Sequence, residues 1–332
     1  MSPRRRRPEL ARADRILPGL WRLRLPLPWP GVPHVNAWAI AAGSGVVLVD
    51  TGASEPGAMA QLERALEQAG VRLDHVRLLV CTHAHPDHYG LAGPIVGAAR
   101  CELWMHPNHG HMTRAAADPE RLLERRIEIA RHSGVPPAAL ERYEAERRDR
   151  GVGVAEVVLP DRELRDGTRV ETDLGAFEVH ETPGHAPSQV VLHQPERGLL
   201  ISGDHVLGRI SLYYDYGYTP DPAGEFLGSL DRVEPLGVQL VLAGHGRPRR
   251  DAAPLVAATR REALRRIDLV RAALDGRPRT PFDLVPVLLG DEVRAPRIVS
   301  WGLPEVLCYL RHLELRGEAR RVAGEEPERW TA

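Results

Sequence analysis

The chain of 332 residues is long enough for one large domain, or for a domain with an appendage. Its hydrophobic content of 43% and charged content of 27% are ordinary for a globular protein, and a net charge of −1 gives no general preference for nucleic acid or membrane. All 44 basic residues are arginine, which excludes a lysine Schiff base and a P-loop lysine.

The cysteines and the first residues of the chain bear on the cellular location of the protein. Cys81, Cys101 and Cys308 are odd in number and far apart, so a disulfide framework is not expected and a cytoplasmic location is favoured. Residues 1–15 carry a basic cluster without an apolar stretch behind it, so we expect a disordered tail rather than a signal peptide. No apolar run reaches about 18 residues, so no membrane span is predicted.

Strands dominate the first part of the chain. They are expected at 20–27, 36–42, 45–50, 76–81 and 101–106, with an amphipathic helix at 55–70. The pattern at about 113–150 is helical and charged. Asp118-Pro119 is a helix start, and the Gly134 region divides this stretch into two helices. We interpret 113–150 as an insertion.

Strands then resume, and we expect them at 155–160, 176–182, 188–194, 198–203 and 238–244. Two groups of strands with flanking helices suit two packed sheets with helices outside, an α/β (α+β) arrangement. After residue 250 we expect helices at 254–276, 280–290 and 303–317 and a hairpin at 318–330. The predicted domains are therefore residues 16–250 and residues 251–332.

Potential metal ligands follow the ends of the buried strands. The motif THAHPDH supplies His83, His85, Asp87 and His88, and later strands are followed by His185 in TPGHAPS, Asp204 in ISGD and His245 in AGHG, while Asp50 ends VVLVD. Strand ends can deliver distant residues to one edge of a sheet. Imidazoles and carboxylates suit zinc, iron or manganese, and so many ligands suit two ions that share a carboxylate.

The remaining histidines are not expected to form the site. His106, His109 and His111 cluster in HPNHGH, and we place them outside it. His34, His75, His132, His180, His193 and His312 are interpreted as surface or internally satisfied residues.

The motifs THAHPDH, TPGHAPS, ISGD and AGHG, in this order, resemble those of the metallo-β-lactamase superfamily over about residues 20–250. The resemblance implies an αββα four-layer sandwich with two divalent ions, first of all zinc, at one edge between the sheets. It assigns His83, His85 and His185 to one ion. It assigns Asp87, His88 and His245 to the other, with Asp204 bridging and Asp50 orienting a ligand histidine.

The resemblance implies hydrolysis more firmly than a substrate. Class B β-lactamases typically carry cysteine where this chain has Asp204, and quorum-quenching lactonases carry tyrosine at the position of Leu207. The ligand set is similar to that of glyoxalase II, the lactonases, the RNase Z group and the lactamase-beta-like endoribonuclease group. We expect a metal-bridging hydroxide to attack an ester, thioester or lactone-type carbonyl of a small molecule, with Asp87 orienting it or moving its proton.

Two segments are candidates for shaping the substrate site. SLYYDYGYTPD contains Tyr213, Tyr214, Tyr216 and Tyr218, and one of these hydroxyls is a candidate for stabilising an oxyanion, the other interpretation being aromatic packing. The helices of 113–150 are candidates for a cap that covers the edge of the sandwich where the metals are expected. Their apolar residues also suit core packing.

The C-terminal residues 251–332 resemble a winged helix, as in the endoribonuclease group. They hold 14 arginines and 13 acidic residues, a net of +1, and the last helix is expected to present Arg311 and Arg316 beside Glu305 and Glu314. A nucleic-acid domain normally shows a clear basic stripe. We therefore favour packing beside the active site or at a homodimer interface. A phosphodiesterase or endoribonuclease, a ligand-sensing nucleic-acid-binding regulator and an iron-dependent oxidoreductase are the alternatives.

Overall fold

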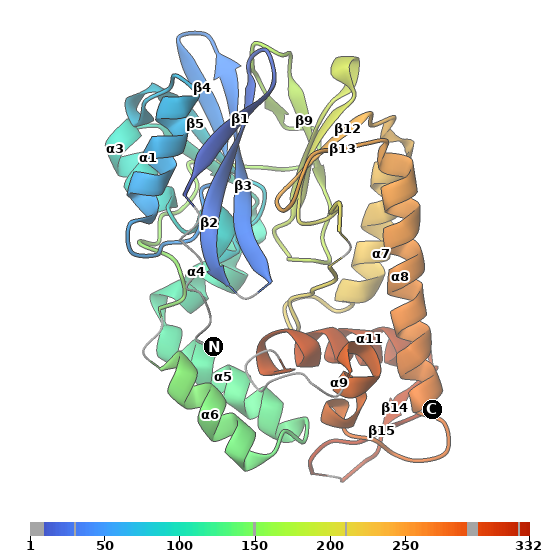
Figure 1. The fold of residues 1–332 in the computed structure, drawn as a ribbon. Helices are drawn as coiled ribbons and strands as arrows, with labels where there is room; N and C mark the ends of the chain where they lie inside the picture. Colours follow the sequence, from blue (N-terminus) through green and yellow to red (C-terminus); the bar gives the residue numbers. More distant parts are fainter. Residues whose placement is uncertain (1–9, 30, 149–150, 210, 291–297, 325) are drawn as a thin grey trace, which may run out of the picture.

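Two β-sheets face each other, and helices cover the outer side of each (Figure 1). A computed structural model describes residues 10–29, 31–148, 151–209, 211–290, 298–324 and 326–332. The αββα sandwich that the sequence predicts is confirmed. Among the described residues, no helix has the length and apolar character needed to cross a membrane.

The first sheet has seven strands in chain order: β1 (Arg12–Leu17), β2 (Leu20–Trp29), β3 (Val32–Ala42), β4 (Gly45–Val49), β5 (Val76–Cys81), β6 (Glu102–Met105) and β7 (Arg162–Glu163). The strands from β1 to β4 are antiparallel, whereas β4 to β7 run parallel. Helices α1 (Ala58–Gln68) and α3 (Ala92–Ala99) lie on its outer side (Figure 1).

The second sheet has six strands in the order β13 (Arg249–Arg250), β12 (Leu240–Ala243), β11 (Leu199–Gly203), β10 (Val190–Gln194), β9 (Phe177–Glu181) and β8 (Arg169–Val170). Only the β11–β12 pairing is parallel. Helices α7 (Pro222–Val233) and α8 (Ala252–Ala273) pack on its outer side, as their shared hydrophobic cluster with β10 and β11 shows.

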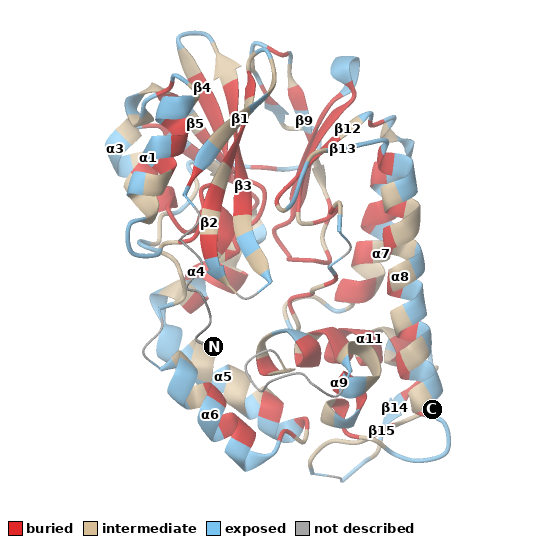
Figure 2. Ribbon diagram, in the orientation of Figure 1, coloured by how far each residue is buried: buried red, intermediate tan, exposed pale blue. Residues whose placement is uncertain are grey.

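The alternation of apolar residues along the strands decides which layer each side chain enters. In β4, Val47 and Val49 face the second sheet, while Val46 and Leu48 join the cluster under α1. Both faces of these central strands are buried (Figure 2), because each sheet packs on its partner sheet on one side and on helices on the other.

Five further helices of the described residues gather at one end of the sandwich (Figure 1). They are α4 (Gly110–Ala117), α5 (Pro119–His132) and α6 (Pro137–Arg147) from the insertion, and α9 (Pro281–Leu289) and α11 (Leu303–Leu315) from the C-terminal part, followed by the paired strands β14 (Arg320–Arg321) and β15 (Trp330–Thr331). Residues from both groups belong to one hydrophobic cluster with α7 and α8. The boundary near residue 250 and the winged-helix assignment stay predictions.

Several local predictions need correction. Residues 155–160 form no strand, and Leu159 is 67% exposed; instead the hydroxyl of Tyr89 donates to the carbonyl of Val158 and accepts from its amide. Strand β1 begins at Arg12, so the tail is shorter than residues 1–15, and residues 1–9 lie outside the described residues. Up to residue 148, where its described part ends, the region near 113–150 contains three helices rather than two, because α4 begins at Gly110.

Helix α7 is absent from the prediction, although Asp221 before Pro222 is the same start signal as Asp118 before Pro119. In α11, Glu305 is buried rather than at the outer face, since Arg266 of α8 pairs with it. Each of the three cysteines is a buried free thiol.

Candidate metal centre

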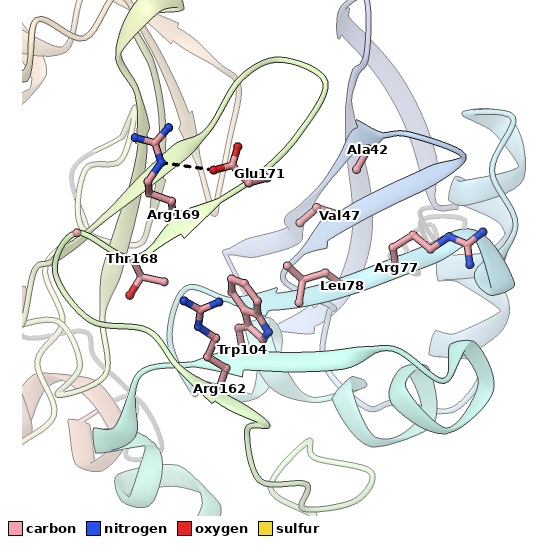
Figure 3. A pocket seen from close by; sticks show the side chains of 10 residues that line it. Ala42, Val47, Arg77, Leu78, Trp104, Arg162, Thr168, Arg169 and Glu171 are labelled. Atoms are coloured by element: carbon pink, nitrogen blue, oxygen red, sulfur yellow. Dashed lines mark hydrogen bonds and ion pairs between the residues drawn. The ribbon is translucent and has the colours of Figure 1, made fainter.

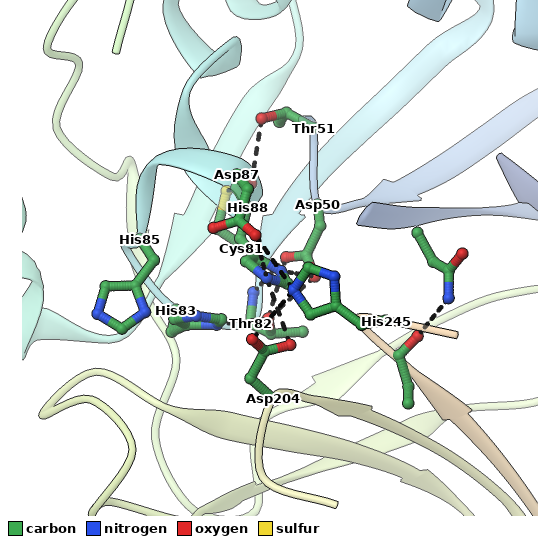
Figure 4. Close-up of polar contacts among 12 residues, drawn as sticks. Asp50, Thr51, Cys81, Thr82, His83, His85, Asp87, His88, Asp204 and His245 are labelled. Carbon is green, nitrogen blue, oxygen red and sulfur yellow. Dashed lines mark hydrogen bonds and ion pairs between the residues drawn. The ribbon is translucent and has the colours of Figure 1, made fainter. Parts of the chain in front are cut away.

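The histidine motif occupies the turn that follows β5. This strand ends at Cys81, and the short helix α2 (Pro86–Tyr89) begins with a proline at its first position, which fixes the backbone for a helix start. His83 and His85 lie in the loop, whereas Asp87 and His88 lie in the helix (Figure 4). All four side chains are buried. The chain thus turns so that its neighbouring polar residues point to one place.

The residues predicted from later strands lie at the same place. His185 follows β9, Asp204 follows β11 and His245 follows β12. Among the described residues, potential ligand atoms lie within 4.8 Å of one another in four sets. Three consist of predicted ligands: His83, His85 and His185; Asp87, His88 and His245; and His83, His88 and Asp204. The fourth is His85, His111 and Asp215. The structure therefore brings together all of the candidate ligands at the edge where strands of the two sheets end.

The histidines are held in definite orientations by contacts to one ring nitrogen. His88 Nδ1 lies 2.8 Å from Asp50 Oδ2, and His245 Nδ1 lies 2.9 Å from the carbonyl oxygen of His34. His185 Nδ1 lies 3.1 Å from the carbonyl oxygen of Tyr213. Each contact leaves the other nitrogen, Nε2, to face the centre, as a metal ligand requires.

Atoms without a hydrogen-bond partner mark the middle of the cluster. Within the described residues, Nε2 of His83, Nε2 of His88 and Oδ1 of Asp204 are buried and make no hydrogen bond. Buried polar atoms without partners are costly, so such a convergence of nitrogen and oxygen needs an explanation. A divalent metal ion would accept an electron pair from each of the three atoms, so the donor set fits such an ion.

His85 is oriented by a residue that the sequence did not reveal. Its Nδ1 lies 3.0 Å from His185 Nε2, and its Nε2 lies 2.9 Å from Asp215 Oδ2. Asp215 also lies 2.8 Å from His111 Nδ1 and accepts a hydrogen bond of 3.1 Å from the hydroxyl of Tyr213. His111 is thus part of the surroundings of the site, contrary to the prediction, because α4 carries it against the tyrosine segment.

Asp50 lies against one of the candidate ligands, His88. It is fully buried, adopts φ 65°, and accepts hydrogen bonds from the amide and the hydroxyl of Thr82. These donors hold the carboxylate against His88. The motif VVLVDTG therefore ends in a strained backbone position whose geometry supports the cluster.

The electrostatics divides the histidines into two groups. Burial lowers the pKa of His83 well below its ordinary range and that of His185 to about 4. Burial also opposes the charged form of His245, but the carboxylates of Asp204 and Asp87 outweigh it and raise its pKa to about 10. Positive charge is thus favoured beside the two carboxylates, and binding of a cation there would release protons.

Glycines in the motifs are required by close packing. A Cβ at Gly244 would lie 2.3 Å from Asp204 Oδ1 and 2.6 Å from His88 Cε1. Gly184 has φ +128°, and a Cβ there would lie 2.5 Å from the backbone of Phe226. Both positions accept only glycine, which explains the glycine before the histidine in AGHG and in TPGH.

The four predicted tyrosines have different surroundings. The ring of Tyr213 lies 5.6 Å from the rings of His85 and His185. Tyr214 is fully buried between Phe226 and Tyr309. Its surroundings fit aromatic packing rather than contact with substrate. Tyr216 and Tyr218 line a cavity together with Tyr213. Contact with substrate stays a prediction for these three.

A larger hollow, of about 560 Å³, lies away from this cluster (Figure 3). Arg77 and Leu78 at the start of β5 contribute to it, whereas the histidines follow the other end of that strand. Trp104, with the guanidinium of Arg162 4.4 Å from its ring centre, forms part of the wall. The hollow contains none of the candidate ligands.

A four-layer sandwich with histidines and carboxylates converging between its sheets defines a class of metal-dependent enzymes. The family model described as the metallo-beta-lactamase superfamily matches residues 30–245. The chain belongs to this superfamily.

Comparisons with individual proteins agree. The chain is 26% identical over 275 residues to "Probable metallo-hydrolase YqjP" of Bacillus subtilis (strain 168), covering 79% of this chain and 82% of that protein. It is similar to the crystal structure of a metallo-beta-lactamase family protein from Thermus thermophilus, with 30% identity, a TM-score of 0.80, and 96% and 99% of the two chains covered. A Beta-lactamase domain protein from Burkholderia ambifaria gives 30% identity, a TM-score of 0.83, and 96% and 94% coverage. The prediction of a hydrolase enzyme is confirmed.

Proposed function

We propose that the protein is a dinuclear metal-dependent hydrolase that cleaves an ester, thioester or lactone-type carbonyl of a small molecule. The observation that carries the proposal is the convergence of unpartnered ligand atoms from His83, His88 and Asp204 at a buried point. His83, His85 and His185 are the proposed ligands of one ion, and Asp87, His88 and His245 of the other, with Asp204 shared between them.

The ions would supply Lewis acidity and water of lowered pKa at neutral pH. The residues of the chain supply orientation and proton transfer. Asp87 Oδ2 lies 3.2 Å from His245 Nε2, and its carboxylate is almost fully buried at the centre. This position supports the proposal that Asp87 orients a water molecule toward the substrate carbonyl and receives its proton.

The charges of the C-terminal part favour a small molecule over nucleic acid. Arg311 pairs with Glu314 at 2.6 Å, and Arg316 pairs with Glu318 at 2.7 Å. These ion pairs leave α11 without a basic stripe among its described residues. The alternatives of an endoribonuclease or a nucleic-acid-binding regulator therefore receive less support.

Zinc is the metal that we propose first, with iron and manganese as alternatives. A cytoplasmic location is part of the same proposal, on the basis of the free cysteines. The homodimer stays a prediction.

The proposal is tested by measuring turnover of metal-loaded protein on a thioester, a lactone, an aryl ester, a phosphodiester, a β-lactam and single-stranded RNA. We expect carbonyl substrates to be cleaved fastest, and Asp87→Ala to reduce kcat by at least about 100-fold. Exclusive cleavage of RNA or the phosphodiester would overturn the substrate class. Full turnover and full metal occupancy in Asp87→Ala would overturn the role of Asp87.

A further inference from the structure

A small cavity adjoins the candidate metal centre. It has a volume of about 60 Å³, and its wall includes His111 and Asp215, of which Asp215 contacts His85. A buried water needs roughly 10–15 Å³ in such a cavity, so this one can hold a short chain or an acid group but not a fused ring system. A substrate group that fills the cavity would end beside His85.

The wall of this cavity is largely apolar and comes from two distant parts of the chain. Ile129 of α5 and Leu303 and Leu307 of α11 contribute side chains. The insertion and the C-terminal part thus enclose one space next to the tyrosine segment. If the insertion acts as a cap, as the sequence allows, then its helix α5 covers this cavity.

Arg126 of α5 places a positive charge in this wall. Burial opposes the charged form of Arg126, but Tyr143, Tyr213 and the carboxylate of Asp215 outweigh it and raise the pKa of the guanidinium. Within the described residues, no carboxylate forms an ion pair with Arg126. Asp215 lies in the same wall, but it is already engaged by His85, His111 and Tyr213.

The neighbouring Arg125 has a different position, although it also reaches the cavity. Its guanidinium donates to the carbonyl of Gly217 at 3.2 Å and lies 4.8 Å from the ring centre of Tyr218. Arg125 is exposed, so water screens its charge. Arg126, half-buried among apolar side chains, is screened less and has more to gain from an anion.

We propose that Arg126 binds a carboxylate of the substrate, so that the enzyme acts on short acyl compounds that carry an acid group. A guanidinium can form two parallel hydrogen bonds to a carboxylate, which fixes both the position and the direction of the bound group. Arg126 would thereby determine which carbonyl reaches the metal centre. This inference rests on the proposed carbonyl hydrolysis.

The test compares two aryl esters of equal length, one ending in a carboxylate and the other in a primary amide. With metal-loaded full-length protein, we expect the acid ester to be preferred, and Arg126→Gln to reduce its kcat/KM by about 10- to 100-fold, mainly through KM. The amide ester should change less than about threefold. Arg126→Lys should recover part of the loss. Arg131→Gln, which changes an exposed arginine of the same helix that does not line the cavity, is the matched control and should have little effect.

A binding measurement separates this inference from the proposed function. Glutarate should raise the thermal midpoint of the metal-free wild-type protein but not that of Arg126→Gln, and glutaramide should raise neither. Equal effects of glutarate on the two proteins, or none on either, would overturn the subsite, as would equal losses for both esters in Arg126→Gln. If inorganic phosphate raised the thermal midpoint and glutarate did not, the proposal that Arg126 binds a carboxylate would be wrong. A glutarate shift without cleavage of either ester would support the subsite and contradict the proposed function.

Discussion

Asp215 joins two histidines and a tyrosine hydroxyl in a buried group beside the candidate metal centre. Its carboxylate lies 2.9 Å from His85 and 2.8 Å from His111. His111 in turn lies 2.8 Å from the hydroxyl of Ser188, which accepts from the amide of Ala84 in the histidine loop. His85 is therefore held in two ways: its ring contacts Asp215, and the backbone of the preceding residue, Ala84, is bound to Ser188.

Replacing Asp215 by asparagine should weaken metal binding without abolishing the fold. Loss of an outer carboxylate partner typically reduces metal affinity by about 10- to 100-fold. Competition with a chromophoric chelator measures this affinity. Asp221→Asn is the matched control, since Asp221 lies in the same segment but caps α7 and bonds His312. Unchanged affinity in Asp215→Asn would show that His85 needs no such partner.

His193 provides a prediction for the pH dependence of stability. It is buried in β10, and burial lowers its pKa, with a further contribution from His180 that Glu178 and Glu196 oppose. Because the unfolded chain then binds more protons than the folded one below its ordinary pKa of about 6.5, stability should fall as the pH drops from 7 to 5. The thermal midpoint of His193→Gln should fall less over this interval.

The control for His193 is His132→Gln, which changes a surface histidine at the end of α5. Its thermal midpoint should follow that of the wild type. If His193→Gln and the wild type lose stability in parallel, protonation of His193 is not responsible.

The seven candidate ligands could be named from the sequence because each ends a recognisable strand and belongs to a motif. Their partners could not. Asp215 lies in an irregular segment, and its contact with His85 spans 130 residues. The carbonyl oxygens that hold His185 and His245 carry no signal in residue type at all, since every residue has one.

Helices α8 and α11 are joined by a buried ion pair as well as by apolar packing. Arg266 Nη1 lies 2.6 Å from Glu305 Oε1, and Tyr309 donates a further hydrogen bond to the same carboxylate oxygen. Glu305 is only 3% exposed. The pair therefore fixes how the last helix lies against the sandwich and, with it, one wall of the small cavity.

Glu305→Ala should lower the free energy of unfolding by up to about 3–5 kcal/mol, because the partly buried guanidinium of Arg266 loses its buried partner and keeps only Glu262. Glu314→Ala, in the same helix and next to the exposed Arg311, should cost only about 0–1 kcal/mol. Urea unfolding of both variants measures the difference. Similar small losses would mean that water reaches Arg266 and replaces the carboxylate.

Elements with regular apolar periods were predictable, while irregular segments were not. Residues 155–160 have the composition of a strand, yet their backbone binds the hydroxyl of Tyr89 instead of a neighbouring strand. Such a choice depends on a tertiary contact across 69 residues. Propensity alone does not report it.

At the scale of the whole molecule, the sandwich brings the ends of β5, β9, β11 and β12 to one edge, and the helical insertion and the C-terminal helices close over that end (Figure 1). The sequence predicted the sheets and the converging ligands because the motifs resemble a known family. It did not predict the shared cavity, since its walls come from α5 and α11, which are far apart in the chain.

The metal content of the purified full-length protein tests the central claim most directly. After loading with zinc and exhaustive dialysis, elemental analysis should give two ions per wild-type chain, and Asp204→Ala should retain one or fewer because the shared carboxylate is lost. His312→Ala, a histidine remote from the centre, should retain two. Absence of bound metal in the wild type, or two ions per chain that survive the replacement of Asp204, would contradict the account.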